Sequence, residues 1–207
     1  LKIKKRQELV PSGTKGRSFD YQGNYLTPLE WSNFVKDPSN IIIDVRNDYE
    51  NKVGTFKNSI SPKTKNFREF KDFVKKNKSK FKGKSIGIFC TGGIRCEKAL
   101  HSFEVQGLTD IHQLQGGILN FLSIAKDKSI WNGDCFVFDE RVTVTKELDP
   151  GDYKQCYACR RPLSNEDLKK KEYKKGISCH KCFFEKSESD RIRYAERQKQ
   201  FDLKVHE

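Results

Sequence analysis

Short apolar runs alternate with amphipathic segments from Tyr25 onward, and this alternation constrains the fold more than any other feature. Apolar runs at residues 41–45, 85–90 and 111–114 predict strands that are buried on both faces. The spacing around them predicts helices at residues 28–36, about 67–79, about 95–106 and 118–125. Strands and helices in this order predict an α/β fold with a doubly wound parallel sheet.

Length and composition indicate a folded protein of one or two domains without a membrane-spanning segment. The chain has 207 residues, which is enough for one or two domains, and its 12% aromatic content argues against global disorder. No apolar run approaches the roughly 18 residues that a membrane span needs, so no membrane partner is expected. Seven cysteines form an odd count with two C-x-x-C pairs, which is unlike a secreted disulfide framework. We therefore expect a cytoplasmic protein.

The positive charge is concentrated in one segment. The chain carries 41 Lys and Arg against 28 Asp and Glu, a net charge of +13, and residues 71–84 hold seven lysines against Asp72. Phe67, Phe70, Phe73 and Val74 fall on one side of this segment at helical spacing, with lysines opposite. The segment fits a solvated helix face, and it also fits a surface for a polyanion such as nucleic acid.

The strand predicted at residues 85–90 brings Cys90 to a short loop that ends at Arg95. Gly92 and Gly93 allow the backbone to fold back with its N–H groups around the sulfur, at the start of a helix. Amide dipoles and the guanidinium favour a thiolate, so we expect a lowered pKa and a catalytic role for Cys90. A buried structural cysteine is the alternative. Thr91 and Ile94 complete the loop.

Four further cysteines have the spacing of a metal site. Two C-x-x-C pairs are separated by 19 residues, the pattern of a zinc ribbon, in which four thiolates close a tetrahedral structural site. Reduced free thiols and partial disulfides are the alternatives. The four residues are Cys156, Cys159, Cys179 and Cys182.

Other candidates have less specific surroundings. Cys96, on the first turn of a predicted helix, fits a structural role better than that of a second catalytic thiol. Cys135 lies in an apolar run and is expected in the core. Asp44 and Arg46 lie at the end of the first predicted strand, where we expect a structural ion pair or hydrogen bond, with direct substrate contact as the alternative.

The residues around Cys90 resemble a known family. Cys-x-x-Gly-x-Arg after a strand resembles the active-site loop of rhodanese domains, as does the earlier segment IIIDVRNDYENKVGTFKNSI. The stretch CTGGIRCEKA, residues 90–99, is more specific and resembles the bacterial rhodanese-like tRNA uridine hydroxylases. So do QLQGGI at 113–118, CFVFDERV at 135–142, and the C-terminal stretches SCHKCF and RYAERQKQ.

This resemblance implies a function. Members of the family form 5-hydroxyuridine at the tRNA wobble position in an oxygen-dependent reaction, which implies tRNA as partner and molecular oxygen as co-substrate. Cys90 would be the essential residue, with Arg95 supporting the loop. The generic rhodanese loop alone implies instead a sulfurtransferase that carries a persulfide on Cys90.

The resemblance also divides the chain into three regions. Residues 1–22 correspond to the last strand and linker of a small N-terminal domain, most of which we expect to be missing. Residues 23–130 correspond to the rhodanese domain. Residues 131–207 form a cysteine-rich, zinc-ribbon-like region that ends in a charged helix at about 187–205. The sequence gives no indication of an oligomeric state.

Overall fold

The computed structural model describes residues 24–204, so the strand and linker predicted in residues 1–22 lie outside the described residues. Two compact units divide the chain. The first comprises residues up to Cys135 together with Thr145–Asp149, and the second comprises Phe136–Val144 and the residues from Pro150 onward. The domain boundaries at 22/23 and 130/131 stay predictions. No helix within residues 24–204 is long and apolar enough to cross a membrane.

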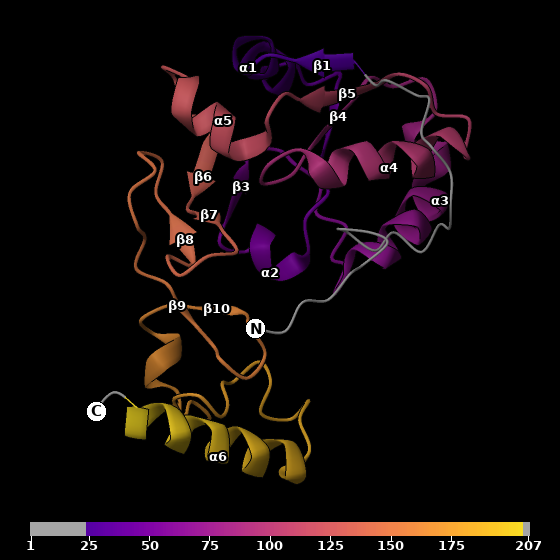
Figure 1. Cartoon of the computed structure of the whole chain (residues 1–207). Coiled ribbons are helices and arrows are strands. Elements are labelled where there is room, and N and C mark those ends of the chain that lie inside the picture. Colours follow the sequence, from indigo (N-terminus) through magenta and orange to yellow (C-terminus); the bar gives the residue numbers. More distant parts are fainter. Residues whose placement is uncertain (1–23, 205–207) are drawn as a thin grey trace. The chain divides into compact units, whose positions relative to one another are not determined.

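A parallel four-stranded sheet forms the centre of the first unit (Figure 1). Its strand order is β1-β5-β4-β2, and each neighbouring pair is parallel. The strands are β1 (Asn24–Leu26), β2 (Ile41–Asp44), β4 (Ile86–Phe89) and β5 (Ile111–Leu114). The predicted α/β class and the three predicted central strands are confirmed.

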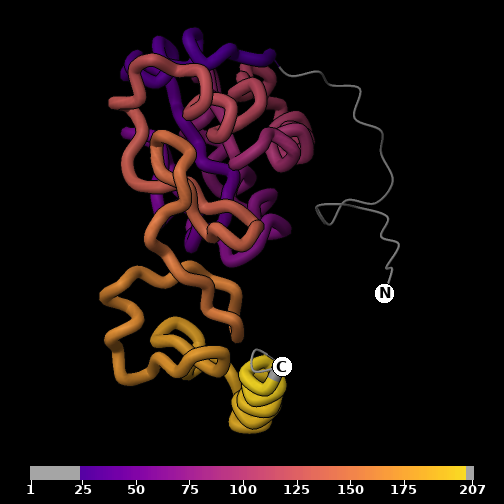
Figure 2. Tube along the Cα trace, turned by 60° about the vertical axis from the view of Figure 1, so that its left-hand side comes forward, coloured from indigo at the N-terminus to yellow at the C-terminus, as the bar shows by residue number. Residues whose placement is uncertain are grey.

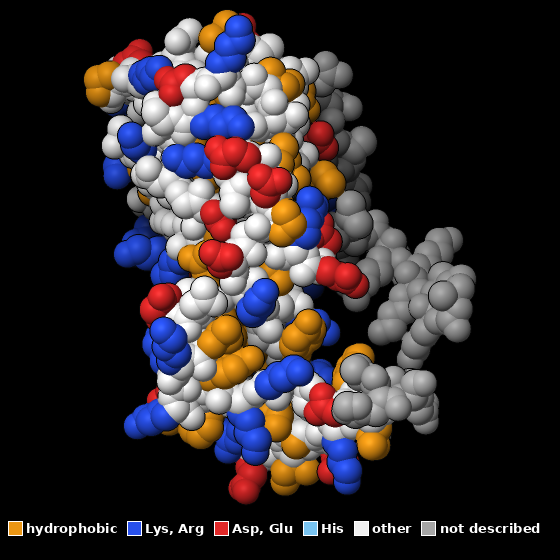
Figure 3. Space-filling model, turned by 90° about the vertical axis from the view of Figure 1, so that its left-hand side faces the viewer, with side chains coloured by type: hydrophobic (Ala, Val, Ile, Leu, Met, Phe, Trp, Pro, Cys, Tyr) orange, Lys and Arg blue, Asp and Glu red, His pale blue; other side chains and the backbone are white. Residues whose placement is uncertain are grey.

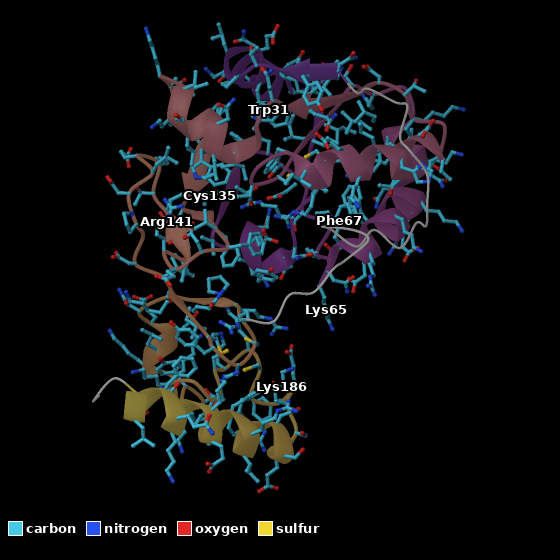
Figure 4. The ribbon with its side chains drawn as sticks, viewed as in Figure 1. Trp31, Lys65, Phe67, Cys135, Arg141 and Lys186 are labelled. Atoms are coloured by element: carbon cyan, nitrogen blue, oxygen red, sulfur yellow. The ribbon has the colours of Figure 1, made fainter. Side chains whose placement is uncertain are left out.

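Helices cover both faces of this sheet, as expected for a doubly wound fold (Figure 1). On one face lie α1 (Pro28–Lys36) and α5 (Gly117–Ile124), and on the other lie α3 (Phe70–Phe81), preceded by the single turn η1 (Phe67–Glu69), and α4 (Ile94–Glu104). Trp31 of α1 is fully buried and lies edge-on to Phe89 of β4, with ring centroids 5.8 Å apart (Figure 4). Both apolar faces of the sheet are thereby removed from water.

The first helix shows how local sequence sets an element boundary. Thr27 and Glu30 form a capping box, in which the Glu30 N–H donates to Thr27 Oγ1 and the Thr27 N–H donates to Glu30 Oε2. Pro28 occupies the first helical position, where its missing N–H costs nothing. Helix α1 begins at Pro28 and ends at Lys36, the bounds that the sequence predicts.

Several short elements were not predicted. They include β1, the four-residue helix α2 (Asp48–Asn51), and β3 (Gly54–Phe56), which pairs antiparallel with β6 (Trp131–Gly133). Each is too short to show a period. Pairing with distant strands stabilises β1 and β3, whereas at the start of α2 the Asn47 N–H donates to Glu50 Oε1 at 3.2 Å. The partner of β3 lies far away in the sequence, so no local pattern announces the pair.

The second unit consists mostly of loops and ends in one long helix, α6 (Glu188–Lys204) (Figure 2). This confirms the predicted charged helix. Two short strands, β9 (Lys154–Gln155) and β10 (Pro162–Leu163), pair antiparallel, and the turn η2 (Asp167–Lys169) follows. Two further short strands, β7 (Cys135–Phe136) and β8 (Thr143–Val144), are separate elements. A turn separates these two strands, and Val142, just before β8, has a φ of 66°, which an extended strand does not adopt.

A buried ion pair lies at the carboxyl end of β2. Arg46 Nη2 lies 2.6 Å from Asp44 Oδ2, and both side chains are fully buried. Phe89 and Trp131 flank the guanidinium, with ring centroids 5.8 and 5.5 Å from its central carbon. The predicted structural role of this pair is confirmed. The second unit contains the same local motif at Asp139 and Arg141, which also approach to 2.6 Å but are about half exposed.

We predict that burial, rather than local geometry, decides what these two ion pairs contribute. Arg46→Met leaves the Asp44 charge buried without its cation and lowers the free energy of unfolding by about 3–5 kcal/mol. Arg141→Met, the matched control, leaves Asp139 in water and changes stability little. Urea denaturation followed by circular dichroism measures both. Equal effects of the two substitutions would contradict this assignment.

Candidate active site and metal centre

The loop around Cys90 has the geometry that the sequence predicts. Cys90 directly follows β4, and Gly93 precedes the first residue of α4 with φ 92°, a conformation that glycine adopts without strain. The Gly93 N–H donates to the Cys90 sulfur at 3.1 Å. Cys90 itself is only 2% exposed, while Ile94 at the rim of the loop is 48% exposed. The sulfur is thus sheltered in a loop that reaches the surface.

Backbone hydrogen bonds from the first turn of α5 hold the Cys90 loop in place. The N–H groups of Ile118 and Leu119 donate to the carbonyl oxygens of Cys90 and Thr91, at 3.0 and 3.2 Å. A Cβ at Gly117 would lie 2.6 Å from the Cys90 carbonyl oxygen, so only glycine permits this approach. The free amides of α5 therefore support the loop backbone instead of facing a ligand.

Arg95 is held by a carboxylate that sequence reasoning missed. Its two terminal nitrogens donate to the two oxygens of Glu50, at 2.6 and 2.7 Å, and Glu50 is fully buried. Arg95 Nη2 also lies 3.3 Å from the Thr91 hydroxyl. A signal was available: a buried arginine needs an acid, and Glu50 follows β2, whose carboxyl end lies beside that of β4.

Cys90 and Cys96 form an unequal pair of thiols. A hydrogen bond from Cys96 lowers the pKa of Cys90 to about 6, helped by the Arg95 charge and backbone N–H groups and opposed by burial. Burial and the neighbouring Cys90 raise the pKa of Cys96 well above its ordinary value. Of the two thiols, Cys90 is therefore the one favoured as a thiolate, and Cys96 the one favoured as a neutral thiol.

Cys135, labelled in Figure 4, is the last residue of the first segment of the first unit. It is fully buried, and burial raises its pKa to about 12. The prediction that Cys135 belongs to the core is confirmed.

The four remaining cysteines come together in the second unit, and their sulfurs all lie within 4.8 Å of one another. Measured separations are 3.9 Å for Cys156–Cys182, 3.8 Å for Cys159–Cys179 and 3.7 Å for Cys179–Cys182. Four sulfurs at about 2.3 Å from a tetrahedral Zn²⁺ lie about 3.8 Å apart. The cluster therefore has the donor type and spacing of a closed metal site, and none of these sulfurs forms a disulfide.

Comparison with known proteins identifies the family. A family model described as Rhodanese-like domain matches residues 27–123. The tRNA uridine(34) hydroxylases of Brucella canis and Brucella suis are each 44% identical to this chain over 205 residues, covering 98% of the chain and 67% of the relative. This chain belongs to the tRNA uridine(34) hydroxylase family. The rhodanese-like loop at Cys90 and the cysteine cluster are therefore features of a family member.

A solved rhodanese-like domain is also similar to part of this family member. The solution NMR structure of the domain from Anabaena sp. covers 54% of this chain and 80% of its own, with 16% identity and a TM-score of 0.44.

We predict that the unequal thiol pair of this hydroxylase family member is visible in its alkylation kinetics. Only the thiolate reacts, so the rate at Cys90 rises with pH and reaches half its plateau near pH 6. Cys96→Ala removes the hydrogen-bond donor and moves this midpoint to higher pH. Peptide mass spectrometry after iodoacetamide treatment reads each cysteine separately, with Cys135 as the unreactive control. A wild-type midpoint at or above pH 8 would overturn the assignment.

Proposed function

We propose that this chain is a tRNA uridine(34) hydroxylase that forms 5-hydroxyuridine at the wobble position with molecular oxygen as co-substrate. One observation carries the proposal: Cys90, whose pKa is lowered to about 6, lies in a six-residue rhodanese-type loop, in a chain 44% identical to enzymes of that name. Cys90 is the catalytic residue, and Arg95 supports the loop. A tRNA substrate also favours a cytoplasmic location.

The chemistry we propose is covalent activation of the uracil ring. The Cys90 sulfur adds to carbon 6, the 5,6 double bond opens, and carbon 5 attacks oxygen with the released electron pair. Two electrons and two protons from a thiol reductant convert one oxygen atom to water and leave the other as the 5-hydroxyl. Loss of the carbon 5 proton and of the Cys90 thiolate restores the double bond.

The loop offers room for this approach. A Cβ at Gly92 or Gly93 would meet no heavy atom within 4 Å, so the backbone beside the sulfur faces open space. Both terminal nitrogens of Arg95 donate to Glu50, so Arg95 acts on Cys90 through its charge and by holding the loop in place. Cys96 supplies the hydrogen bond that keeps Cys90 ionised before the ring binds.

Oxidised sulfur on Cys90 is a different route to the same product, and a persulfide on Cys90 gives a different activity, sulfur transfer. The loop geometry also favours sulfur transfer, because a six-residue loop around a thiolate accommodates a small sulfur anion. The two functions differ in the nucleoside that they leave in tRNA.

The decisive experiment quantifies modified nucleosides by mass spectrometry in tRNA from cells that lack this protein. We predict that wild type and Cys135→Ala restore 5-hydroxyuridine and its derivatives, whereas Cys90→Ala does not. Both substitutions remove a buried thiol, so Cys135→Ala controls for loss of stability. Restored thiolated nucleosides with unchanged 5-hydroxyuridine would show sulfur transfer instead. A tRNA carrying 5-fluorouridine then distinguishes the routes, since covalent activation leaves an adduct on the Cys90 peptide.

We further propose that the four-cysteine cluster holds a structural Zn²⁺. The support is the sulfur spacing and the all-thiolate donor set, which suits zinc. The ion would connect the turn between β9 and β10 to the turn that carries Cys179 and Cys182. A unit with few apolar contacts of its own would gain most of its stability from such a link.

We predict that removal of zinc loosens the second unit selectively. Cys159→Ser, or a strong chelator, should abolish about one bound zinc per chain and increase amide hydrogen exchange across residues 150–204, while the first unit keeps its protection. Elemental analysis and exchange mass spectrometry measure the two effects, with Cys135→Ala as the variant that retains zinc. A carefully reduced preparation without metal would refute the site.

A further inference from the structure

The segment of residues 63–84 presents a dense basic surface, here named the α3 basic surface and defined as its exposed Lys and Arg side chains. It contains ten such cations and two acids, Glu69 and Asp72. Five of the lysines lie on α3 itself, at Lys71, Lys75, Lys76, Lys78 and Lys80. Glu69 is already occupied, because its carboxylate accepts hydrogen bonds from the Lys65 N–H and the Asn66 amide.

These cations are not neutralised within the described part of the protein. None of the ten forms an ion pair with another residue of the range 24–204. Cations elsewhere do have acidic partners, such as the exposed Lys36 with Asp127 and the partly buried Arg161 with Glu185. Figure 3 shows a face on which basic and acidic side chains are intermixed in this way. Neighbouring like charges on one helix are unfavourable, so the α3 basic surface favours an anionic partner.

The apolar side of α3 is buried in the core of the first unit, and this packing leaves the lysine-rich side facing solvent. Phe70 packs against Phe103 of α4, with ring centroids 5.8 Å apart, and Val74 and Phe81 are buried with them. An amphipathic helix binds a membrane through its apolar face, and this apolar face is already used inside the first unit. The available side is lysine-rich, which suits contacts to phosphates that carry no sequence information.

Two sets of contacts connect the same segment to the elements around the Cys90 loop. α3 packs along α4, which begins in the loop of Cys90 (Figure 1). Before α3, close to Lys65 (Figure 4), the Thr64 carbonyl accepts the N–H of Asp48 at 2.9 Å. Asp48 begins α2, the helix whose Glu50 holds Arg95. A polyanion on this surface is therefore placed relative to Cys90 by fixed contacts.

We propose that the α3 basic surface binds the phosphate backbone of tRNA and so presents the wobble nucleotide to the Cys90 loop. This inference rests on the proposed function for the identity of its partner. It assigns affinity to α3 and chemistry to the loop, so binding and turnover are separable. Lys71, Lys75, Lys78 and Lys82 lie along one side of the segment and are expected to contact successive phosphates.

The test compares two variants of equal charge by fluorescence anisotropy with unmodified tRNA over a range of salt concentrations. The first changes Lys71, Lys75, Lys78 and Lys82 to Gln, which preserves helix propensity. The control changes four exposed lysines of the second unit to Gln: Lys154, Lys169, Lys171 and Lys175. We expect the first variant to lose affinity more than tenfold at physiological ionic strength, with the slope of log K against log salt reduced by about 3. The control should change affinity less than threefold.

Four outcomes would count against the inference or separate it from the proposed function. Equal losses in both variants would overturn it, because net charge rather than α3 would then govern binding. Unchanged binding in the α3 variant, with its helix content confirmed by circular dichroism, would also overturn it. If wild type binds tRNA through α3 yet forms no 5-hydroxyuridine, the proposed function fails and the binding surface stands. Anionic vesicles containing phosphatidylserine serve as a further arm, and α3-dependent binding to vesicles without binding to tRNA would refute RNA as the partner.

Discussion

The bidentate ion pair between Arg95 and Glu50 joins the Cys90 loop to the rest of the first unit. Both groups are buried, so each depends on the other to offset the loss of hydration. Because Glu50 takes up much of the Arg95 charge, that charge cannot alone keep Cys90 ionised. The hydrogen bond from Cys96 is the largest cause of the lowered Cys90 pKa, with the Arg95 charge second among the lowering effects. The lowered pKa of Cys90 thus depends on hydrogen bonds to its sulfur as well as on the Arg95 charge.

Local sequence was sufficient wherever a single segment contains both partners of an interaction. Thr27 and Glu30 lie in one turn, and the glycines of the Cys90 loop lie beside the sulfur that they serve, so helix start and loop geometry could be predicted. The cysteine cluster was predictable for a similar reason, because each C-x-x-C pair brings two sulfurs together before any tertiary contact forms. In each of these cases the chain folds locally in the way that its residues alone favour.

Interactions between distant segments could not be predicted in the same way. Glu50 lies 45 residues before Arg95, and only the parallel pairing of β2 with β4 brings their ends together. The strands β3 and β6 are equally remote in sequence. The two Asp-x-Arg motifs make the point most directly: Asp44–Arg46 and Asp139–Arg141 have the same spacing and the same 2.6 Å contact, yet one is buried and the other exposed. Burial depends on the whole fold, and burial decides the energy.

The seven cysteines also show that environment, more than residue type, determines chemistry. Cys90 and Cys96 lie next to one another, yet burial leaves Cys96 neutral while hydrogen bonds ionise Cys90. Exposed lysines outside the site act differently, since water and salt screen them from a buried sulfur. The charge of the α3 basic surface therefore has little influence on the reactivity of Cys90, but it extends into solvent where a polyanion approaches. Substrate capture and thiolate chemistry can then be tuned independently, because one depends on screened surface charge and the other on buried hydrogen bonds.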